Sequence, residues 1–326
     1  MLNYDIIIVG GGESGMLAAM AAKRNGAQNI LIIEREEQLG GALNQFIHTG
    51  FGIYTFGENF TGPEYAQRLI DEVDRLNIKV KLKSLVIEIS KDKTVTVVNE
   101  KGINEYKTEA IVLAMGCREK PRGAVNIPGS KCAGIFTVGT TQKFINIEGY
   151  MPGKQVVMVG SSDIGLLMAR NMVLEGANIK AVLEPMSYSG GSERNIEECI
   201  KDFNIPLKLG YTITDILGHD RVEGVVISRV DSNFIPIADT EEHIPCDTLL
   251  LSAGLLPESE IALKSGILIS SVTGGVMVDR NQETNVEGIF ACGDILYVHD
   301  IEEDISIESI YAGNNAAGFV LKKDSR

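Results

Sequence analysis

Apolar runs and polar turns alternate along the first third of the chain in the order expected for a parallel sheet with connecting helices. Tyr4–Val9 is nearly continuously apolar and β-branched, which is typical of a strand buried on both faces. A glycine-rich turn follows, and an Ala- and Met-rich segment to about Asn25 predicts a helix. Asn29–Glu34 has the pattern of a second buried strand. This order, with glycines at the first turn, indicates a Rossmann-like unit.

The next segment predicts a helix and then a change to antiparallel structure. Thr61-Gly-Pro-Glu64 has the form of a capping box at the start of an amphipathic helix. Between Ile78 and Tyr106 the pattern alternates and is interrupted by polar turns, so we expect antiparallel strands there. Ala110–Ala114 is again a buried strand, and it ends in Met115-Gly116.

The same succession then recurs, because Gly160 lies 150 residues after Gly10 in an equivalent turn. The predicted elements of this second copy are a strand at Gln155–Val159, a helix at Asp163–Glu175, a strand at Ile179–Glu184, alternating segments from Leu207 to Val230, and a strand at Thr248–Leu251. The tail has a strand-turn pattern, GIFACGD, and a helix from about Ile305. It contains no third nucleotide turn and is expected to complete the first domain. We therefore predict a discontinuous first domain, residues 1–117 with 252–326, and a second domain at 118–251.

The first turn carries the spacing that binds a dinucleotide. Gly10-x-Gly12-x-x-Gly15 follows a strand and opens a helix, and an acidic residue ends the next strand 19 residues later. The glycines permit a tight turn, close approach to a pyrophosphate and close helix packing, while the helix N-terminus attracts phosphate. The carboxylate accepts a hydrogen bond from a ribose hydroxyl. The candidate ligands are Gly10, Gly12, Glu13, Ser14, Gly15, Glu34 and Arg35.

The second turn has the same spacing with one departure, since Ser162 stands where the middle glycine is expected. A serine side chain crowds the pyrophosphate position, although it is small and could hydrogen-bond the phosphate. Glu184 follows Gly165 by 19 residues, and a carboxylate there favours NAD(H) over NADP(H), unless the nearby Arg194 reverses the preference. The candidate ligands are Gly160, Ser162, Asp163, Ile164, Gly165 and Glu184. The alternative is a Rossmann-like domain that has lost its nucleotide.

The segment Thr284–Asp294, TNVEGIFACGD, resembles the second FAD signature of flavoproteins with two dinucleotide-binding domains, the group of thioredoxin reductase and glutathione reductase. AMG at 114–116 and SAG at 252–254 resemble the linker motifs of that group. The resemblance implies an α/β fold of two Rossmann-like, three-layer ββα domains, with FAD in the discontinuous domain and NAD(H) as the second cofactor. It implies that Asp294 binds the ribitol of FAD. It adds to the FAD ligands Gly41, Ala114, Gly116, Gly293 and Asp294.

The redox cysteines of that group are missing from both of their usual places. Leu43 and His48 occupy the positions that a cysteine pair holds in glutathione reductase relatives. The segment that corresponds to the CxxC of thioredoxin reductases, residues 134–141, has no cysteine. We therefore expect electrons to leave the flavin without a thiolate relay. His48 is the candidate catalytic residue, either as acid/base or only as a residue that positions its loop, and His299 is a weaker candidate.

Several motifs resemble a narrower branch, the flavoproteins associated with anaerobic-type glycerol-3-phosphate dehydrogenases, opine oxidases and hydrogen cyanide synthase. They include GGALNQFIHTGFG, SYSGGSERN and CGDILYVHD. The resemblance implies a second flavoprotein dehydrogenase subunit as partner, and a homodimer is the other assembly expected. The sequence departs from the branch at Phe46, where a cysteine is expected, and at Ser162.

Composition narrows the alternatives further. The 326-residue chain has a net charge of −14, so nucleic acids and anionic membranes are disfavoured as partners. The five cysteines are scattered without a CxxC, which favours a reducing cytoplasm and argues against a zinc or other metal centre. The N-terminus predicts neither a signal peptide nor a spanning helix.

The sequence supports one main functional hypothesis and one alternative. The first is an FAD-dependent oxidoreductase that moves electrons between NAD(H) and a partner dehydrogenase subunit or a small-molecule substrate, without a redox-active disulfide. The alternative is an FAD-binding electron-transfer or scaffold subunit of a dehydrogenase complex with a non-functional NAD site. A thiol-disulfide reductase is disfavoured by the missing CxxC.

Overall fold

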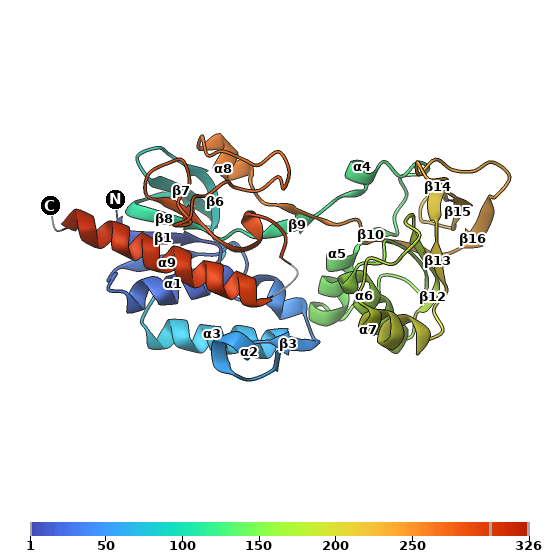
Figure 1. The fold of residues 1–326 in the computed structure, drawn as a ribbon, viewed down its shortest axis with the longest axis horizontal. Helices are drawn as coiled ribbons and strands as arrows, with labels where there is room; N and C mark the ends of the chain where they lie inside the picture. Colours follow the sequence, from blue (N-terminus) through green and yellow to red (C-terminus); the bar gives the residue numbers. More distant parts are fainter. Residues whose placement is uncertain (1, 300–301, 325–326) are drawn as a thin grey trace. The chain divides into compact units, whose positions relative to one another are not determined.

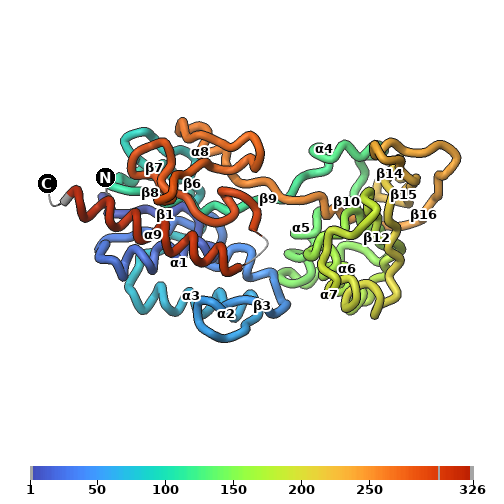
Figure 2. The backbone as a smooth tube through the Cα atoms, in the orientation of Figure 1, coloured from blue at the N-terminus to red at the C-terminus, as the bar shows by residue number. Residues whose placement is uncertain are grey.

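A computed structural model describes residues 2–299 and 302–324, and its contacts divide the chain into two units. The first unit combines Met1–Arg118 with Leu255–Arg326, and the second is Glu119–Gly254. Figure 2 lets the reader follow the chain from the first unit through the second and back to the first. Each unit is built around its own parallel sheet.

The central sheet of the first unit has the order β5-β2-β1-β8-β19, and all of these strands run parallel. Ile6 in the middle strand is in register with Ile30 on one side and Ala110 on the other. The strands are β1 (Leu2–Val9), β2 (Ile30–Ile33), β5 (Lys79–Lys81), β8 (Gly102–Leu113) and β19 (Ile289–Ala291). The predicted buried strands are thus confirmed.

Alternate residues of the central strand serve two different cores. Ile6 and Ile8 pack under three helices, α1 (Glu13–Arg24), α3 (Gly62–Arg75) and α9 (Glu302–Asp324). Ile7 and Val9 face the antiparallel strands β6 (Leu85–Ile89) and β7 (Thr94–Asn99) on the opposite side. Figure 1 shows α9 running alongside α1. The sheet is therefore the middle of the predicted three-layer arrangement.

Two details of this sheet differ from the sequence prediction. Lys79–Lys81 lies in the segment expected to be antiparallel, but it pairs parallel with β2 and extends the central sheet. β8 is a single twelve-residue strand, whose first half pairs antiparallel with β7 and whose second half pairs parallel with β1. The sequence pattern changes along β8 because its first half has a polar face and its second half is buried on both faces.

The second unit repeats this arrangement. Its parallel sheet has the order β13-β12-β11-β17-β10, and a three-stranded antiparallel sheet, β14-β15-β16, forms the second layer. The elements are β10 (Ile135–Thr137), β11 (Gln155–Val159), α6 (Asp163–Leu174), β12 (Asn178–Glu184), β13 (Leu207–Leu209), β14 (Tyr211–Leu217), β15 (Gly224–Arg229), β16 (Glu242–Pro245) and β17 (Thr248–Leu251). The two parallel sheets differ in where one edge strand lies in the sequence. In the second unit this strand is β10, which precedes the other strands of its sheet, whereas in the first unit it is β19, which follows them.

Shorter elements connect these layers, and β9 pairs with β18 where the chain leaves and re-enters the first unit. They are η1 (Gly41–Gln45), β3 (Thr49–Phe51), α2 (Ile53–Phe56), β4 (Phe60–Thr61), β9 (Cys117–Glu119), α4 (Arg122–Val125), α5 (Val138–Gln142), η2 (Lys143–Ile147), α7 (Glu193–Asn195), η3 (Ile196–Lys201), β18 (Leu255–Pro257), α8 (Glu260–Lys264) and η4 (Gly293–Ile295).

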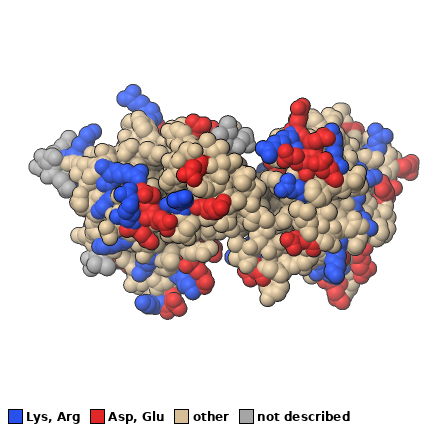
Figure 3. All heavy atoms as spheres, turned by 90° about the horizontal axis from the view of Figure 1, so that it is seen from below, with Lys and Arg blue, Asp and Glu red and all other residues tan. Residues whose placement is uncertain are grey.

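Charged side chains of both signs are interspersed on the face shown in Figure 3. The acidic excess of the sequence is therefore not gathered into a single patch on that face. Within residues 2–299 and 302–324, no helix combines the length and the apolar character needed to cross a membrane.

The capping box at α3 gives a first test. Glu64 Oε2 accepts hydrogen bonds from the backbone N–H of Thr61 at 2.9 Å and from its hydroxyl at 2.7 Å. We expect Thr61→Ala to destabilise the start of α3 by about 1 kcal/mol, which speeds amide hydrogen exchange there by about fivefold. Thr49→Ala, the same change at an exposed residue, should leave amide exchange in α3 unchanged. Equal exchange rates in the two variants would show that the Thr61–Glu64 capping box does not stabilise the start of α3.

Candidate dinucleotide-binding sites

The first glycine turn lies at the carboxyl end of the central strands, where its backbone is held by both neighbouring strands. Gly10 N–H donates to Ile33 O at 2.9 Å, and Ala114 N–H donates to Val9 O at 2.8 Å. Gly10 has a φ of +104°, and a Cβ added to it would lie 2.3 Å from Ala114 O. A Cβ at Gly15 would lie 1.9 Å from Gly10 O. Only glycine fits both positions.

Glu34 is fixed by the same turn. Its side chain is almost fully buried, and its Oε2 accepts the backbone N–H of Gly11 at 2.6 Å. Its other oxygen accepts the N–H of Glu36 at 2.8 Å. Arg35 lies next to it but is exposed, with Nε 3.7 Å from a carboxylate oxygen of Glu36. The carboxylate is therefore held against the glycine turn, whereas Arg35 makes no contact with the turn among its described interactions.

The loop after β2 closes over the turn. A Cβ added to Gly41, the first residue of η1, would lie 3.1 Å from the Cα of Gly12. Gly12 is the N-cap of α1, and Ser14 follows in its first turn. Because Gly12 and Gly41 have no side chains, the backbone forms an open cradle at the N-terminus of a twelve-residue helix. This cradle and Glu34 fit a dinucleotide, because pyrophosphate needs close backbone approach and ribose needs an acceptor.

The second turn reproduces this geometry in the second unit. Gly160 has a φ of +91°, and a Cβ added to it would lie 2.1 Å from Ser252 O. Glu184 Oε2 accepts the N–H of Ser161 at 3.1 Å and its hydroxyl at 2.7 Å. Its other oxygen accepts the N–H of Met186 at 3.1 Å. The two turns therefore hold their carboxylates through equivalent backbone groups.

Ser162 uses its hydroxyl within the protein. Ser162 Oγ lies 2.8 Å from Ser252 Oγ at the end of β17. Ser162 is also the N-cap of α6, and Ile164 in the first turn of that helix packs on the core with its neighbours. Gly165 also lies close to Ser252, because an added Cβ would be 2.7 Å from Ser252 Oγ. The serine hydroxyl is thus directed to the neighbouring strand end.

A segment that the sequence analysis did not assign to the site lies on this second turn. The loop 189–192 is bound to it, since Gly190 N–H donates to Ser161 Oγ at 3.0 Å. Asp163 Oδ1 accepts the N–H of Ser192 at 2.8 Å and the amide of Asn195 at 2.6 Å. The Ser/Gly-rich stretch SYSGGS was the available signal. Arg194, which could have favoured NADP(H), is paired with Glu198 at 2.8 Å.

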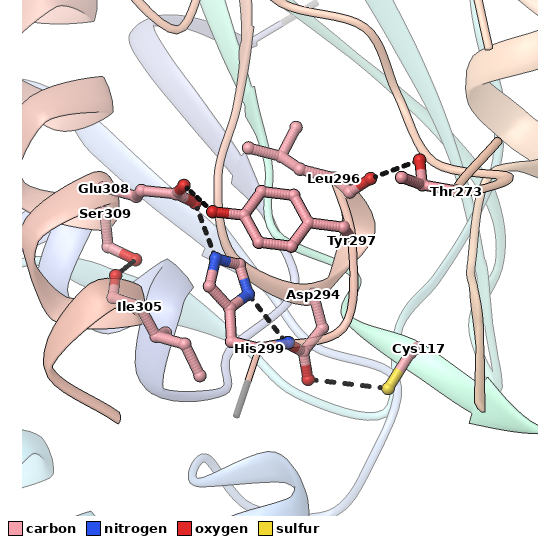
Figure 4. Close-up of polar contacts among 9 residues, drawn as sticks. All are labelled: Cys117, Thr273, Asp294, Leu296, Tyr297, His299, Ile305, Glu308 and Ser309. Carbon is pink, nitrogen blue, oxygen red and sulfur yellow. Dashed lines mark hydrogen bonds and ion pairs between the residues drawn. The ribbon is translucent and has the colours of Figure 1, made fainter. Parts of the chain in front are cut away.

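The third motif places Asp294 in a network in the first unit (Figure 4). Asp294 Oδ1 accepts the N–H of His299 at 3.1 Å and lies 3.0 Å from its Nδ1. Asp294 Oδ2 accepts the thiol of Cys117 at 3.5 Å. Gly293, just before it, has a φ of +75°. The carboxylate therefore connects η4 to β9.

His299 is a buried cation in this network. Its side chain is 1% exposed and lies between Asp294 and Glu308, whose Oε2 is 3.1 Å from Nε2. Burial lowers the pKa of His299, but hydrogen bonds to the two carboxylates outweigh burial and raise the pKa to about 9. The Tyr297 ring packs against the imidazole with a centroid distance of 4.1 Å and a tilt of 31°, and its hydroxyl donates to Glu308 at 2.8 Å. The sequence analysis missed Glu308, which lies in no motif, and it gave no role to Tyr297, although Tyr297 lies within the quoted segment CGDILYVHD.

His48 lies apart from this network in its described contacts. Its ring packs between Phe46 and Phe51, with ring centroids at 5.8 and 5.2 Å, and its Nδ1 is 3.0 Å from Thr49 O. The structure therefore places it in an aromatic cluster, with no described hydrogen bond to Glu34 or Asp294.

The residues near the linker motifs have protein partners. Gly116 has a φ of +67°, and Arg118 pairs with Glu258 at 3.0 Å and Glu260 at 3.2 Å. All five cysteines are free thiols. Burial raises the pKa of the Cys292 thiol to about 12, so it stays protonated at neutral pH.

Two ββα units with equivalent glycine turns define a flavoprotein fold of the two-dinucleotide-domain class. A family model described as pyridine nucleotide-disulphide oxidoreductase matches residues 4–317. The chain belongs to this family, whose members are FAD-dependent NAD(P)H oxidoreductases.

The individual proteins that the chain resembles share fewer than a third of their residues with it. The chain is 26% identical over 325 residues to one component of the alkyl hydroperoxide reductase of Staphylococcus aureus, covering 96% of this chain and 58% of that protein. It is 28% identical to a CoA-dependent NAD(P)H sulfur oxidoreductase of Pyrococcus abyssi, covering 90% of this chain and 63% of that one. It therefore spans about three fifths of the length of these relatives. Thioredoxin reductase of T. acidophilum has a similar fold, with a TM-score of 0.78, 22% identity and full coverage of both chains.

The His299 network gives a pH-dependent prediction. A raised pKa means that the stabilisation is fully present below the ordinary value of 6.5 and is lost as pH rises through about 9. We expect His299→Gln to cost about 1–3 kcal/mol at low pH and progressively less as pH approaches 9. Thermal unfolding midpoints across this range measure the difference.

The control is His219→Gln, because that side chain is 95% exposed although it also contacts a carboxylate. It should shift the midpoint little at any pH. If the unfolding midpoint of His299→Gln lies below that of the wild-type protein by the same amount at every pH, His299 stabilises the fold without its charge.

Proposed function

We propose that this protein is an FAD-dependent oxidoreductase that moves electrons between NAD(H) and a partner dehydrogenase subunit or a small-molecule substrate, without a redox-active disulfide. The observation that carries the proposal is the repeated turn geometry. Glu34 and Glu184 each accept a turn N–H, at 2.6 and 3.1 Å, beside a glycine that no other residue could replace. Two such sites in one chain suit the transfer of electrons between two dinucleotides.

In the first unit, the residues proposed to hold FAD are those of the glycine turn, Glu34, Gly41 and Asp294. The backbone of Gly12, Glu13 and Ser14 would bind the pyrophosphate, and Glu34 would accept from the adenosine ribose. When bound, FAD supplies the redox chemistry, and the protein supplies orientation and electrostatics. His299 would keep Asp294 aligned as an acceptor for the ribitol.

The second unit is proposed to prefer NAD(H). Glu184 would accept from a free 2′-hydroxyl and would repel a 2′-phosphate. The nearby arginine does not offset this, because Arg194 is paired on its own segment with Glu198. Glu184 is the residue on which this preference depends.

The absence of a thiol relay supports the rest of the proposal. Leu43 and His48 stand where one cysteine pair would be, and residues 134–141 contain none. Cys292, within the FAD signature, is held as a protonated thiol. The partner is proposed to be a second flavoprotein dehydrogenase subunit of the glycerol-3-phosphate or opine oxidase type, on the strength of the motif resemblance. A homodimer is the other assembly proposed.

One observation favours a second function. The loop 189–192 is hydrogen-bonded to Ser161 and Asp163 at the N-terminus of α6, where a pyrophosphate would bind. If the loop keeps this position, the chain is an FAD-binding electron-transfer or scaffold subunit with a non-functional NAD site.

Anaerobic titration of the purified, FAD-loaded protein with NADH and then NADPH tests the two functions. We expect stoichiometric NADH to bleach the flavin band, with NADPH much less effective. If the flavin stays oxidised with both nucleotides, the second function holds and the NAD(H) oxidoreductase is excluded for the isolated chain.

The variant Glu184→Gln tests the nucleotide preference. We expect it to weaken NADH binding by about tenfold, which corresponds to ~1.4 kcal/mol, and to narrow the gap between NADH and NADPH. Glu175→Gln is the matched control. It removes the same charge at an exposed position, the C-cap of α6. Equal effects of the two variants would show that Glu184 acts only through net charge.

A further inference from the structure

A cluster of five side chains joins four helices of the first unit beside the proposed FAD cradle. Glu13 is the first residue of α1 and Glu302 the first of α9, while Tyr65 comes from α3 and Thr55 from α2. Ser306 lies one turn after Glu302. Tyr65 and Ser306 are fully buried, so the oxygens that face them are withdrawn from bulk water.

Both carboxyls are directed at the same two hydroxyls. Tyr65 Oη lies 3.3 Å from Glu13 Oε1 and 3.0 Å from Glu302 Oε1. Ser306 Oγ lies 3.2 and 2.9 Å from the same two atoms. Thr55 Oγ1 adds contacts of 2.9 Å to Tyr65 and 3.3 Å to Ser306. The cluster therefore has six oxygen–oxygen contacts at hydrogen-bond distance.

The hydroxyls cannot supply a hydrogen to each of these contacts. Each has one hydrogen, so three donors serve six contacts, and ionised carboxylates only accept. A proton on one carboxyl would add a donor and remove one of two like charges. None of the ion pairs among the described residues places a cation on Glu13 or Glu302.

Electrostatics favour one negative charge in the cluster rather than two. The N-termini of α1 and α9 each favour a carboxylate. Against this, burial and the neighbouring Glu302 raise the pKa of Glu13 well above its usual range. The titratable groups facing Glu13 are Glu302 and Tyr65, and burial also raises the pKa of Tyr65, which keeps the phenol neutral. Two carboxyls that share their partners repel each other when both are charged.

We propose that Glu13 and Glu302 share a single proton at neutral pH, and that this proton is required for tight binding of the FAD pyrophosphate at the start of α1. The binding part of this inference rests on the proposed FAD site. A second negative charge at the helix N-terminus would repel the pyrophosphate and offset the attraction of the helix end. Glu13 and Glu302 are positioning residues in this scheme, because they act through the helix end.

The proton is tested directly by infrared difference spectroscopy of the protein at neutral pH. We expect a carboxylic-acid C=O band in the wild-type protein that shifts in D₂O and is lost in Glu13→Gln or Glu302→Gln. The band should persist in Glu303→Gln, which removes an exposed carboxylate from the same helical turn. No band assignable to the pair would overturn the proposal, whether or not the protein binds FAD.

The binding role is tested by the dissociation constant of FAD as a function of pH. In the wild-type protein we expect Kd to rise by up to about tenfold per pH unit once the pair loses its proton. Glu13→Gln should bind FAD with an affinity that stays flat over the same range, because glutamine is neutral and can donate as the acid does. Equal pH dependence in wild type and Glu13→Gln would overturn the binding role.

Unfolding provides a readout that does not need FAD and therefore separates the two proposals. A raised carboxyl pKa stabilises the fold at low pH, and this stabilisation is lost as pH rises from about 4.5 through the raised value. The Tm of Glu13→Gln should thus gain on that of the wild type as pH rises, and Glu303→Gln should track the wild type. If this holds and no FAD binds, the proposed function fails while the shared proton stands.

Discussion

Close packing of backbone on backbone at the glycine turns is the constraint on which the rest of this structure depends. At Gly10 and Gly160 the turn touches the carbonyl of the neighbouring strand, and any Cβ would overlap it by more than an ångström. This contact brings the turn N–H groups to Glu34 and Glu184 and aims each following helix at the same side of its sheet. The start of each helix and the position of each carboxylate thus follow from one steric condition that is met twice.

Much of this architecture could be predicted from the sequence, since buried parallel strands and glycine turns have strong local signals. The exceptions have physical reasons. Lys79–Lys81 is short and has two charged residues, so nothing local showed that it extends the parallel sheet. β8 changes its pattern midway because its surroundings change, and a single strand therefore looked like two. β10 and β16 are short, and β10 is stabilised by β17, which is distant in sequence.

Some residues of the proposed sites could also be predicted from the sequence, and others could not. Residues such as Gly10, Glu34 and Glu184 could be named in advance because their spacing is the requirement itself. The residues that contact His299 could not, since Glu308 belongs to no motif, the motif around Tyr297 shows no role for its side chain, and their contacts arise only from the approach of α9 to η4. The pair Glu13 and Glu302 was also beyond reach, because helices from opposite ends of the chain create it. The spacing of residues in the sequence shows which of them could bind a ligand, whereas the packing of distant segments determines which side chains surround them.

The origin of β19 has a consequence for how the protein is made. The second unit is one continuous stretch, and its sheet can close as soon as its last strand, β17, has left the ribosome. The sheet and helical layer of the first unit lack β19 and α9 until the final tenth or so of the chain has been synthesised. Until then the apolar face of the first sheet lacks the helix that covers part of it. The first unit therefore completes its core only after every strand of the second unit has been made, although β1 is made before any of them.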